Sequence, residues 1–158
     1  MVLILNDEYI KGIRMRRKLM AVLVASTGFA AGAQADTYTC HLNVNSRARG
    51  YISDKITFSI SDGNQRARVS DAISLATNGR AVPAVLTINT NKRLSIKWAL
   101  YDVIGPRNKR VDKLDYKLSL WMSLGNKVSV IAKSYVGANE ALTTPLEVSS
   151  AGKCRLQK

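Results

Sequence analysis

The sequence predicts an all-β protein: a small antiparallel β-barrel of about eight strands in up-and-down order, with a β-sandwich as the alternative. Three observations support this fold class. Several short runs alternate polar and apolar residues with a period of two, which buries one face of a strand and leaves the other in water. Residues that favour tight turns separate these runs. The only two cysteines, Cys40 and Cys154, lie near the two ends of the expected mature chain.

The alternating runs group into three hairpins and two terminal strands. The hairpins are expected at residues 55–61 with 65–72, 83–90 with 92–101, and 115–124 with 127–136. The terminal strands are expected near residues 37–44 and 145–156. Turns are expected at Asp62-Gly63-Asn64, Thr90-Asn91-Lys92 and Gly125-Asn126, where Gly and Asn tolerate positive φ angles. Residues 71–76 are compatible with a short helical turn.

The alternation also predicts which side chains face the core. Each strand should turn its apolar positions inward and its polar positions toward solvent. The expected core residues are Ile56, Phe58, Ile60, Leu86, Ile88, Leu94, Ile96, Trp98, Leu100, Leu118, Leu120, Val128 and Val130.

The two cysteines predict a disulfide that joins the termini. Cys40 is the fifth residue of the expected mature chain, and Cys154 is the fifth from its end. A disulfide requires its two Cα atoms to lie within about 7 Å, so the first and last strands must be neighbours. A closed barrel meets this condition and removes both sheet edges.

The N-terminal region has the three parts of a secretory signal peptide. Met15 is followed by three charged residues at 16–18, residues 19–29 are apolar, and residues 33–35 form a small-x-small cleavage site. Residues 1–35 are therefore expected to be an extension and a cleavable signal that starts at Met15. Residues 36–158 are expected to be a single β domain. The apolar run is too short to cross a bilayer, so we expect a periplasmic or secreted protein without a membrane span.

The charge balance predicts acidic partners. The whole chain carries a formal net charge of +13. Removal of residues 1–35 leaves 19 basic and 9 acidic residues, a net charge of +10. Export makes nucleic acid a poor candidate for the partner. An acidic envelope polymer, a lipid headgroup or an acidic protein fits better. The alternative interpretation is that the charge only keeps the protein soluble.

No arrangement of residues indicates catalysis, a cofactor or a metal. His41 is the only histidine, and it has no second ligand at metal-binding spacing. Serine–histidine–acid chemistry could use only this histidine, and no serine lies in a nucleophile-elbow motif. Asp112 and Asp115 are the closest acid pair outside the signal region, but basic residues surround them, so charge balance explains them. We therefore expect a non-catalytic protein.

Two features indicate binding instead. A basic segment that begins at Gly105 is expected to be an exposed loop between two strands, and it attracts anions. Its candidate anion contacts are Arg107, Lys109, Arg110 and Lys113. Trp121 falls on the polar phase of its strand, which is typical of a contact surface. Tyr101 has the same phase, so these two aromatic residues are the candidate apolar contacts. A solubilising loop, and a tryptophan covered by neighbouring residues, are the alternatives.

The overall frame resembles two families without a specific motif. Tyr38-Thr39-Cys40 near the start and Cys154 near the end resemble the periplasmic inhibitors of C-type lysozyme, although no inhibitor loop matches. The frame is also similar to lipocalin-like barrels, but the Gly-x-Trp opening strand is missing. We therefore expect an exported barrel that binds an anionic envelope component or acidic partner. A carrier of a small apolar ligand and an enzyme inhibitor are the alternative functions.

Overall fold

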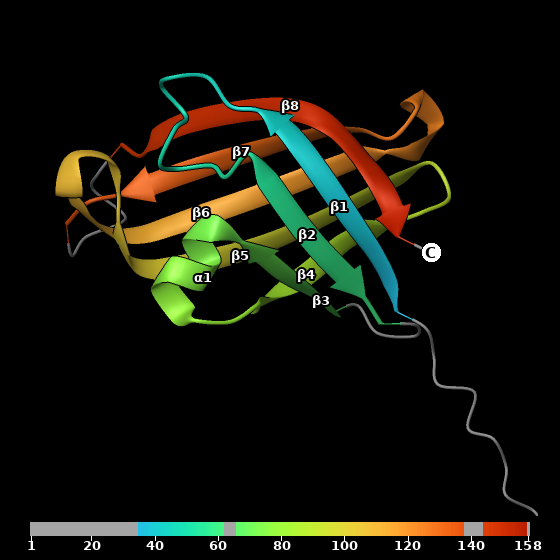
Figure 1. Cartoon of the computed structure of the whole chain (residues 1–158), viewed down its shortest axis with the longest axis horizontal. Helices are drawn as coiled ribbons and strands as arrows, with labels where there is room; N and C mark the ends of the chain where they lie inside the picture. The colour runs from blue at the N-terminus through green and yellow to red at the C-terminus, as the bar shows by residue number, and fades with distance from the viewer. Residues whose placement is uncertain (1–34, 62–65, 138–143, 158) are drawn as a thin grey trace, which may run out of the picture. The chain divides into compact units, whose positions relative to one another are not determined.

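A computed structural model of the chain describes residues 35–61, 66–137 and 144–157. Eight antiparallel strands form a closed barrel in sequence order, which confirms the predicted fold (Figure 1). The strands are β1 (Asp36–Asn43), β2 (Lys55–Ile60), β3 (Arg66–Asp71), β4 (Val82–Asn89), β5 (Arg93–Ile104), β6 (Arg110–Trp121), β7 (Lys127–Tyr135) and β8 (Leu146–Gln157). Two single 3₁₀ turns, η2 (Pro106–Asn108) and η3 (Met122–Leu124), follow β5 and β6.

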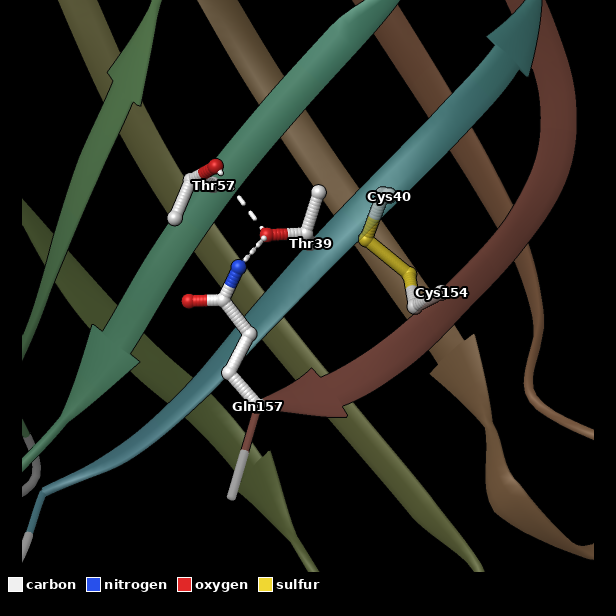
Figure 2. Close-up of a disulfide and its surroundings, with 5 residues drawn as sticks. All are labelled: Thr39, Cys40, Thr57, Cys154 and Gln157. Atoms are coloured by element: carbon white, nitrogen blue, oxygen red, sulfur yellow. Dashed lines mark hydrogen bonds between the residues drawn. A yellow bond between two sulfur atoms is a disulfide. The ribbon is translucent and has the colours of Figure 1, made fainter.

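The barrel closes where β8 pairs with β1. Cys40 lies directly opposite Cys154 in this pairing, and the two form the predicted disulfide. On the outer surface, Gln157 Nε2 donates to Thr39 Oγ1 at 2.7 Å, and Thr39 Oγ1 lies 3.4 Å from Thr57 Oγ1 (Figure 2). The covalent bond and these polar contacts together tie β8, β1 and β2 into one continuous surface.

One end of the barrel, the helix end, is covered by α1 (Ala72–Asn78) and by the loop at residues 44–54. Asp71 caps α1: its carboxylate accepts from the backbone N–H groups of Ile73 and Ser74 and from the Ser53 hydroxyl. The helix ends at Gly79, whose φ of 66° suits a residue without a side chain. The opposite end, the turn end, carries the β4–β5 and β6–β7 connections (Figure 1).

Large side chains fill the interior. All the predicted core residues are buried except Ile88, and Trp98 stacks on Tyr116 with ring centroids 4.7 Å apart. Burial strongly raises the pKa of the Tyr116 hydroxyl, and the nearby charge of Asp71 adds to this effect. That hydroxyl donates to the backbone oxygen of Tyr51 at 2.7 Å, which attaches the 44–54 loop to the core.

Two predictions about strand geometry were wrong in detail. Ile88 is only half-buried, because the β4–β5 register shifts between Leu86 and Ile88. The β5–β6 hairpin also extends further than predicted: Val103 pairs with Val111, and both are buried. The inward phase of β5 changes at Asp102, which has a φ of 53°, so simple alternation ends there although the pairing continues.

The predicted extension and signal peptide lie outside the described residues except for Ala35, as does the turn predicted at residues 62–64. Within the described part of the chain, no helix has the length and apolar character needed to cross a membrane.

Candidate anion-binding surface

The structure divides the predicted basic segment between a turn and a strand. Arg107 and Lys109 are exposed in the short connection at the helix end, as predicted. Arg110 and Lys113 lie in β6 and not in a loop, because the hairpin pairing continues to Ile104 opposite Arg110. We call these four residues the helix-end cluster.

Carboxylates neutralise half of the helix-end cluster. Arg110 forms an ion pair with Asp102, and its Nε lies 4.0 Å from Asp112. The hydrogen bond to Asp102 raises the pKa of the Arg110 guanidinium. Lys113 lies 3.3 Å from Asp115, and its ammonium also sits over the Tyr135 ring, 5.6 Å from the centroid. Only Arg107 and Lys109 keep an uncompensated charge among the described residues of this cluster.

The two candidate aromatic contacts lie in different places. Tyr101 is 60% exposed and pairs with Lys113, so it borders the helix-end cluster. Trp121 faces outward as predicted, but it pairs with Arg93 at the turn end and is half-buried. The Arg93 guanidinium lies over its indole, 5.2 Å from the ring centroid. Trp121 therefore does not contribute to the helix-end cluster.

Four other arginines, Arg47 and Arg49 in the 44–54 loop and Arg66 and Arg68 in β3, could form a further basic patch if they met in space, but they do not form a single patch. Arg47 and Arg49 follow the end of β1 and therefore lie at the helix end. Arg66 begins β3, which runs in the same direction as β1, so it lies at the turn end. The two pairs belong to different regions of the surface.

A second basic region was not predicted, and strand register creates it. Six residues on six consecutive strands are directly opposite one another: Arg93 pairs with Trp121, Trp121 with Lys127, and so on around the barrel. Their order from β5 to β2 is Arg93, Trp121, Lys127, Lys153, His41 and Lys55. All six lie on the outward phase of their strands. We call them the cationic row; it contains four basic residues, one histidine and no acid.

Among the described residues, no ion pair involves the cationic row. The ion pairs that the described residues form elsewhere use Asp102, Asp112, Asp115 and Glu147, which lie on β5 to β8 toward the helix end. One example is Lys133 Nζ, 3.1 Å from Glu147, and this hydrogen bond raises the pKa of Lys133. In the row, Lys127 and Lys153 are instead direct cross-strand neighbours, an arrangement of like charges that destabilises a sheet.

A hollow of about 480 Å³ lies at the centre of the cationic row. It is lined by His41, Asn43, Lys127, Val128, Ala151, Gly152 and Lys153. A side chain does not fit at position 152, because a Cβ atom there would lie 1.9 Å from the His41 carbonyl oxygen. Gly152 thus lets the backbones of β1 and β8 approach closely beside the hollow.

A row of small, mostly polar residues lies beside the cationic row, toward the helix end. It crosses β5, β6, β7, β8 and β1, and its members are Ser95, Ser119, Ser129, Ala151 and Asn43. At its β5–β6 end, the two buried serine hydroxyls lie 3.1 Å apart, and Arg93 Nη2 donates to Ser119 Oγ at 3.4 Å. Ser129 and Asn43 are more accessible, so they offer hydrogen-bonding groups next to the lysines.

This surface is suited to electrostatic capture of anions. Lysine ammonium groups offer several donors each, and among the described residues no carboxylate forms an ion pair with those of the row. His41 lies between Lys55 and Lys153, and the described residues contain no cluster of three potential metal ligands. His41 is isolated in the sequence because its neighbours in space are distant in the chain.

Comparisons with known proteins do not identify a relative: no family model matches the chain, and no curated protein or solved structure matches it significantly.

Proposed function

We propose that this protein is an exported, non-catalytic β-barrel whose basic surface binds an anionic component of the cell envelope or an acidic partner. The observation that carries this proposal is the unequal distribution of charge. The described residues include 18 basic and 7 acidic residues, and the ion pairs among them lie toward the helix end of β5 to β8. The basic residues of the cationic row take part in none of these ion pairs.

The cost of this arrangement supports binding over simple solubility. A net charge alone can be spread over a surface, with opposite charges interspersed. The cationic row instead places Lys127 and Lys153 side by side, although like charges directly opposite each other destabilise a sheet. A bound anion would relieve that repulsion.

The filled interior favours surface binding over the alternative of a small apolar ligand held inside. An eight-stranded barrel has room either for packed side chains or for one small ligand. Here Phe58, Trp98, Tyr116 and the leucines of β5 and β6 occupy the interior. Displacing them would cost the free energy of core packing.

Salt-dependent binding tests the proposal. The purified protein should bind at least one anionic probe at low ionic strength, from a panel of phosphatidylglycerol vesicles, polygalacturonate and inorganic polyphosphate. Binding should weaken steeply at about 0.5 M salt, because screening shortens the range of exposed charges. Dextran, a neutral polymer, is the control. Failure to bind any anionic probe at low salt would refute the proposal.

Export is tested separately by mass spectrometry of the product recovered from cells that express the full chain. The expected mature protein begins at Asp36 and contains the oxidised pair Cys40–Cys154. Recovery of the intact chain with residues 1–35 attached would contradict this part of the proposal.

A further inference from the structure

We infer that the cationic row and its central hollow form a binding groove for a linear, negatively charged glycan, a sugar chain that bears carboxylate or phosphate groups. This inference rests on the proposed function and specifies the location of the site and the class of its ligand. Its starting point is the hollow lined by Lys127, Lys153, His41 and Asn43.

The shape of the row favours a chain over a flat surface. The row follows six of the eight strands around a closed barrel, so its residues face outward in widely different directions. A bilayer can touch only one side of such a curved surface. A flexible polymer can follow the row around the barrel and contact one strand after another, with neighbouring strands about 4.8 Å apart.

The chemistry of the groove favours a glycan over other polyanions. Lys127 and Lys153 supply cations for carboxylate or phosphate oxygens. Beside them, Ser129 and Asn43 supply hydroxyl and amide groups, which suit the hydroxyl groups of a sugar. Inorganic polyphosphate has no hydroxyl groups along its chain and would use only the lysines.

The size of the hollow agrees with this ligand. A volume of about 480 Å³ is in the range of small-ligand sites and can hold one or two sugar units. Of the exposed large apolar residues, Tyr101 and Ile104 lie away from the row, and Leu124 lies in the β6–β7 turn beside it. Within the row, the indole of Trp121 is already covered by Arg93, so the groove offers little that would insert into a lipid bilayer.

The test compares two double variants with the same loss of charge. Lys127→Gln with Lys153→Gln removes the centre of the row, and Arg107→Gln with Lys109→Gln removes the free charges of the helix-end cluster. All four side chains are exposed, so both variants should keep the fold, which thermal unfolding will verify. We expect the row variant to bind oligogalacturonate or a phosphorylated mannan roughly tenfold more weakly. The cluster variant should bind nearly as well as the wild type.

A third variant tests the sugar contacts themselves. Asn43→Ala with Ser129→Ala leaves the charge unchanged but removes two polar groups next to the hollow. It should weaken glycan binding severalfold while leaving polyphosphate binding unchanged. For the wild type, glycan affinity should also rise with oligomer length until the chain spans the row.

The outcomes separate the inference from the proposed function. Equal losses in the two charge variants would mean that only net charge matters, which overturns the inference and leaves the proposed function in place. Preferential binding of the wild type to vesicles, polyphosphate or an acidic protein would do the same. An unchanged glycan affinity in the Asn43/Ser129 variant would also overturn it. Absence of binding to every anion would refute both.

Discussion

The two basic regions of this barrel differ in how their charge arises. The helix-end cluster is dense in the sequence, yet its hairpin partner strand places Asp102 against Arg110, and β6 itself supplies Asp115 to Lys113. The cationic row is dispersed over more than a hundred residues of sequence, yet register assembles it without any acid. Charge density along a chain is therefore a poor measure of uncompensated charge on a sheet.

The pairing of β8 with β1, which we call the barrel seam, distinguishes the cationic row from the helix-end cluster. His41 and Lys153 are opposite each other because Cys40 and Cys154, the preceding and following residues, are joined by the disulfide. The helix-end cluster lies on a local hairpin and does not depend on that bond. Changes at the seam should therefore affect the row far more than the cluster.

The largest effect is expected from removal of the disulfide by Cys40→Ala with Cys154→Ala. The bond closes a loop with a sequence separation of 114, so its loss should lower the free energy of unfolding by roughly 4–5 kcal/mol in the chain-entropy model. Urea denaturation monitored by circular dichroism measures this change. Anion binding by the row should also fall, since β8 and β1 can separate. A loss of stability below about 1 kcal/mol would show that pairing alone holds the seam.

A smaller but more local effect is expected from Gly152→Ala. The new Cβ atom would meet the His41 carbonyl oxygen, a backbone atom that cannot move aside as a side chain would. We expect a loss of roughly 1–3 kcal/mol in the free energy of unfolding, together with weaker glycan binding because β1 must shift.

Ala151→Ser is the matched control for this substitution. Residue 151 is the exposed neighbour of Gly152 and points outward, so it should tolerate a slightly larger side chain. Equal stability of the Gly152→Ala variant and the wild type would mean that the close approach of β1 is not required.

Replacement of His41 by glutamate should raise the stability of the protein but lower its affinity for anions. His41→Glu places a carboxylate between Lys55 and Lys153, its direct partners on β2 and β8. Opposite charges across strands contribute roughly 0.2–1 kcal/mol each, so the thermal midpoint should rise. Anion affinity should fall because the new carboxylate competes for the lysines. His41→Gln, which adds no charge, should do neither, and a glutamate variant that binds anions as before would contradict the functional role of the row.

The barrel itself could be predicted because strand alternation and turn residues are local signals. Alternation identified the inward phase of β2, β5, β6 and β7, and the positions of Cys40 and Cys154 required the first and last strands to meet. The prediction ended too early at Tyr101. There the left-handed backbone of Asp102 changes the phase of β5, and alternation ceases to report the pairing.

The cationic row could not be predicted from local patterns because it depends on the register between strands. One pair of the row could nonetheless have been predicted. A disulfide between Cys40 and Cys154 fixes the β1–β8 register, and antiparallel pairing then places His41 opposite Lys153. The positions of Lys127 and Arg93 depend in addition on the lengths of the β6–β7 and β5–β6 connections. A small change in turn geometry can change the register between two strands by one residue. Such a shift would turn these side chains inward.

The smallest stability effect should come from the acids that neutralise the helix-end cluster, and it tests whether pairing is what distinguishes the two regions. Asp102→Asn with Asp112→Asn removes the carboxylates beside Arg110. Asparagine tolerates the positive φ of residue 102, so the fold should be retained. Asp102 raises the pKa of Arg110, but a guanidinium stays protonated without that help. The substitution therefore frees a positive charge without changing it.

This variant is best measured in a background that lacks the row charges, with Lys127→Gln and Lys153→Gln. Low-salt affinity for polygalacturonate should recover severalfold, because the helix-end cluster then presents Arg107, Lys109 and Arg110 without an opposing carboxylate. Asp36→Asn is the control for the single substitution Asp102→Asn, since each removes one exposed acid and Asp36 lies at the start of β1, away from both regions. If the two substitutions restored binding equally, net charge would govern the affinity. If only the helix-end substitution restored it, the acids that the hairpin places beside Arg110 would be the reason that this basic segment does not act as an anion site.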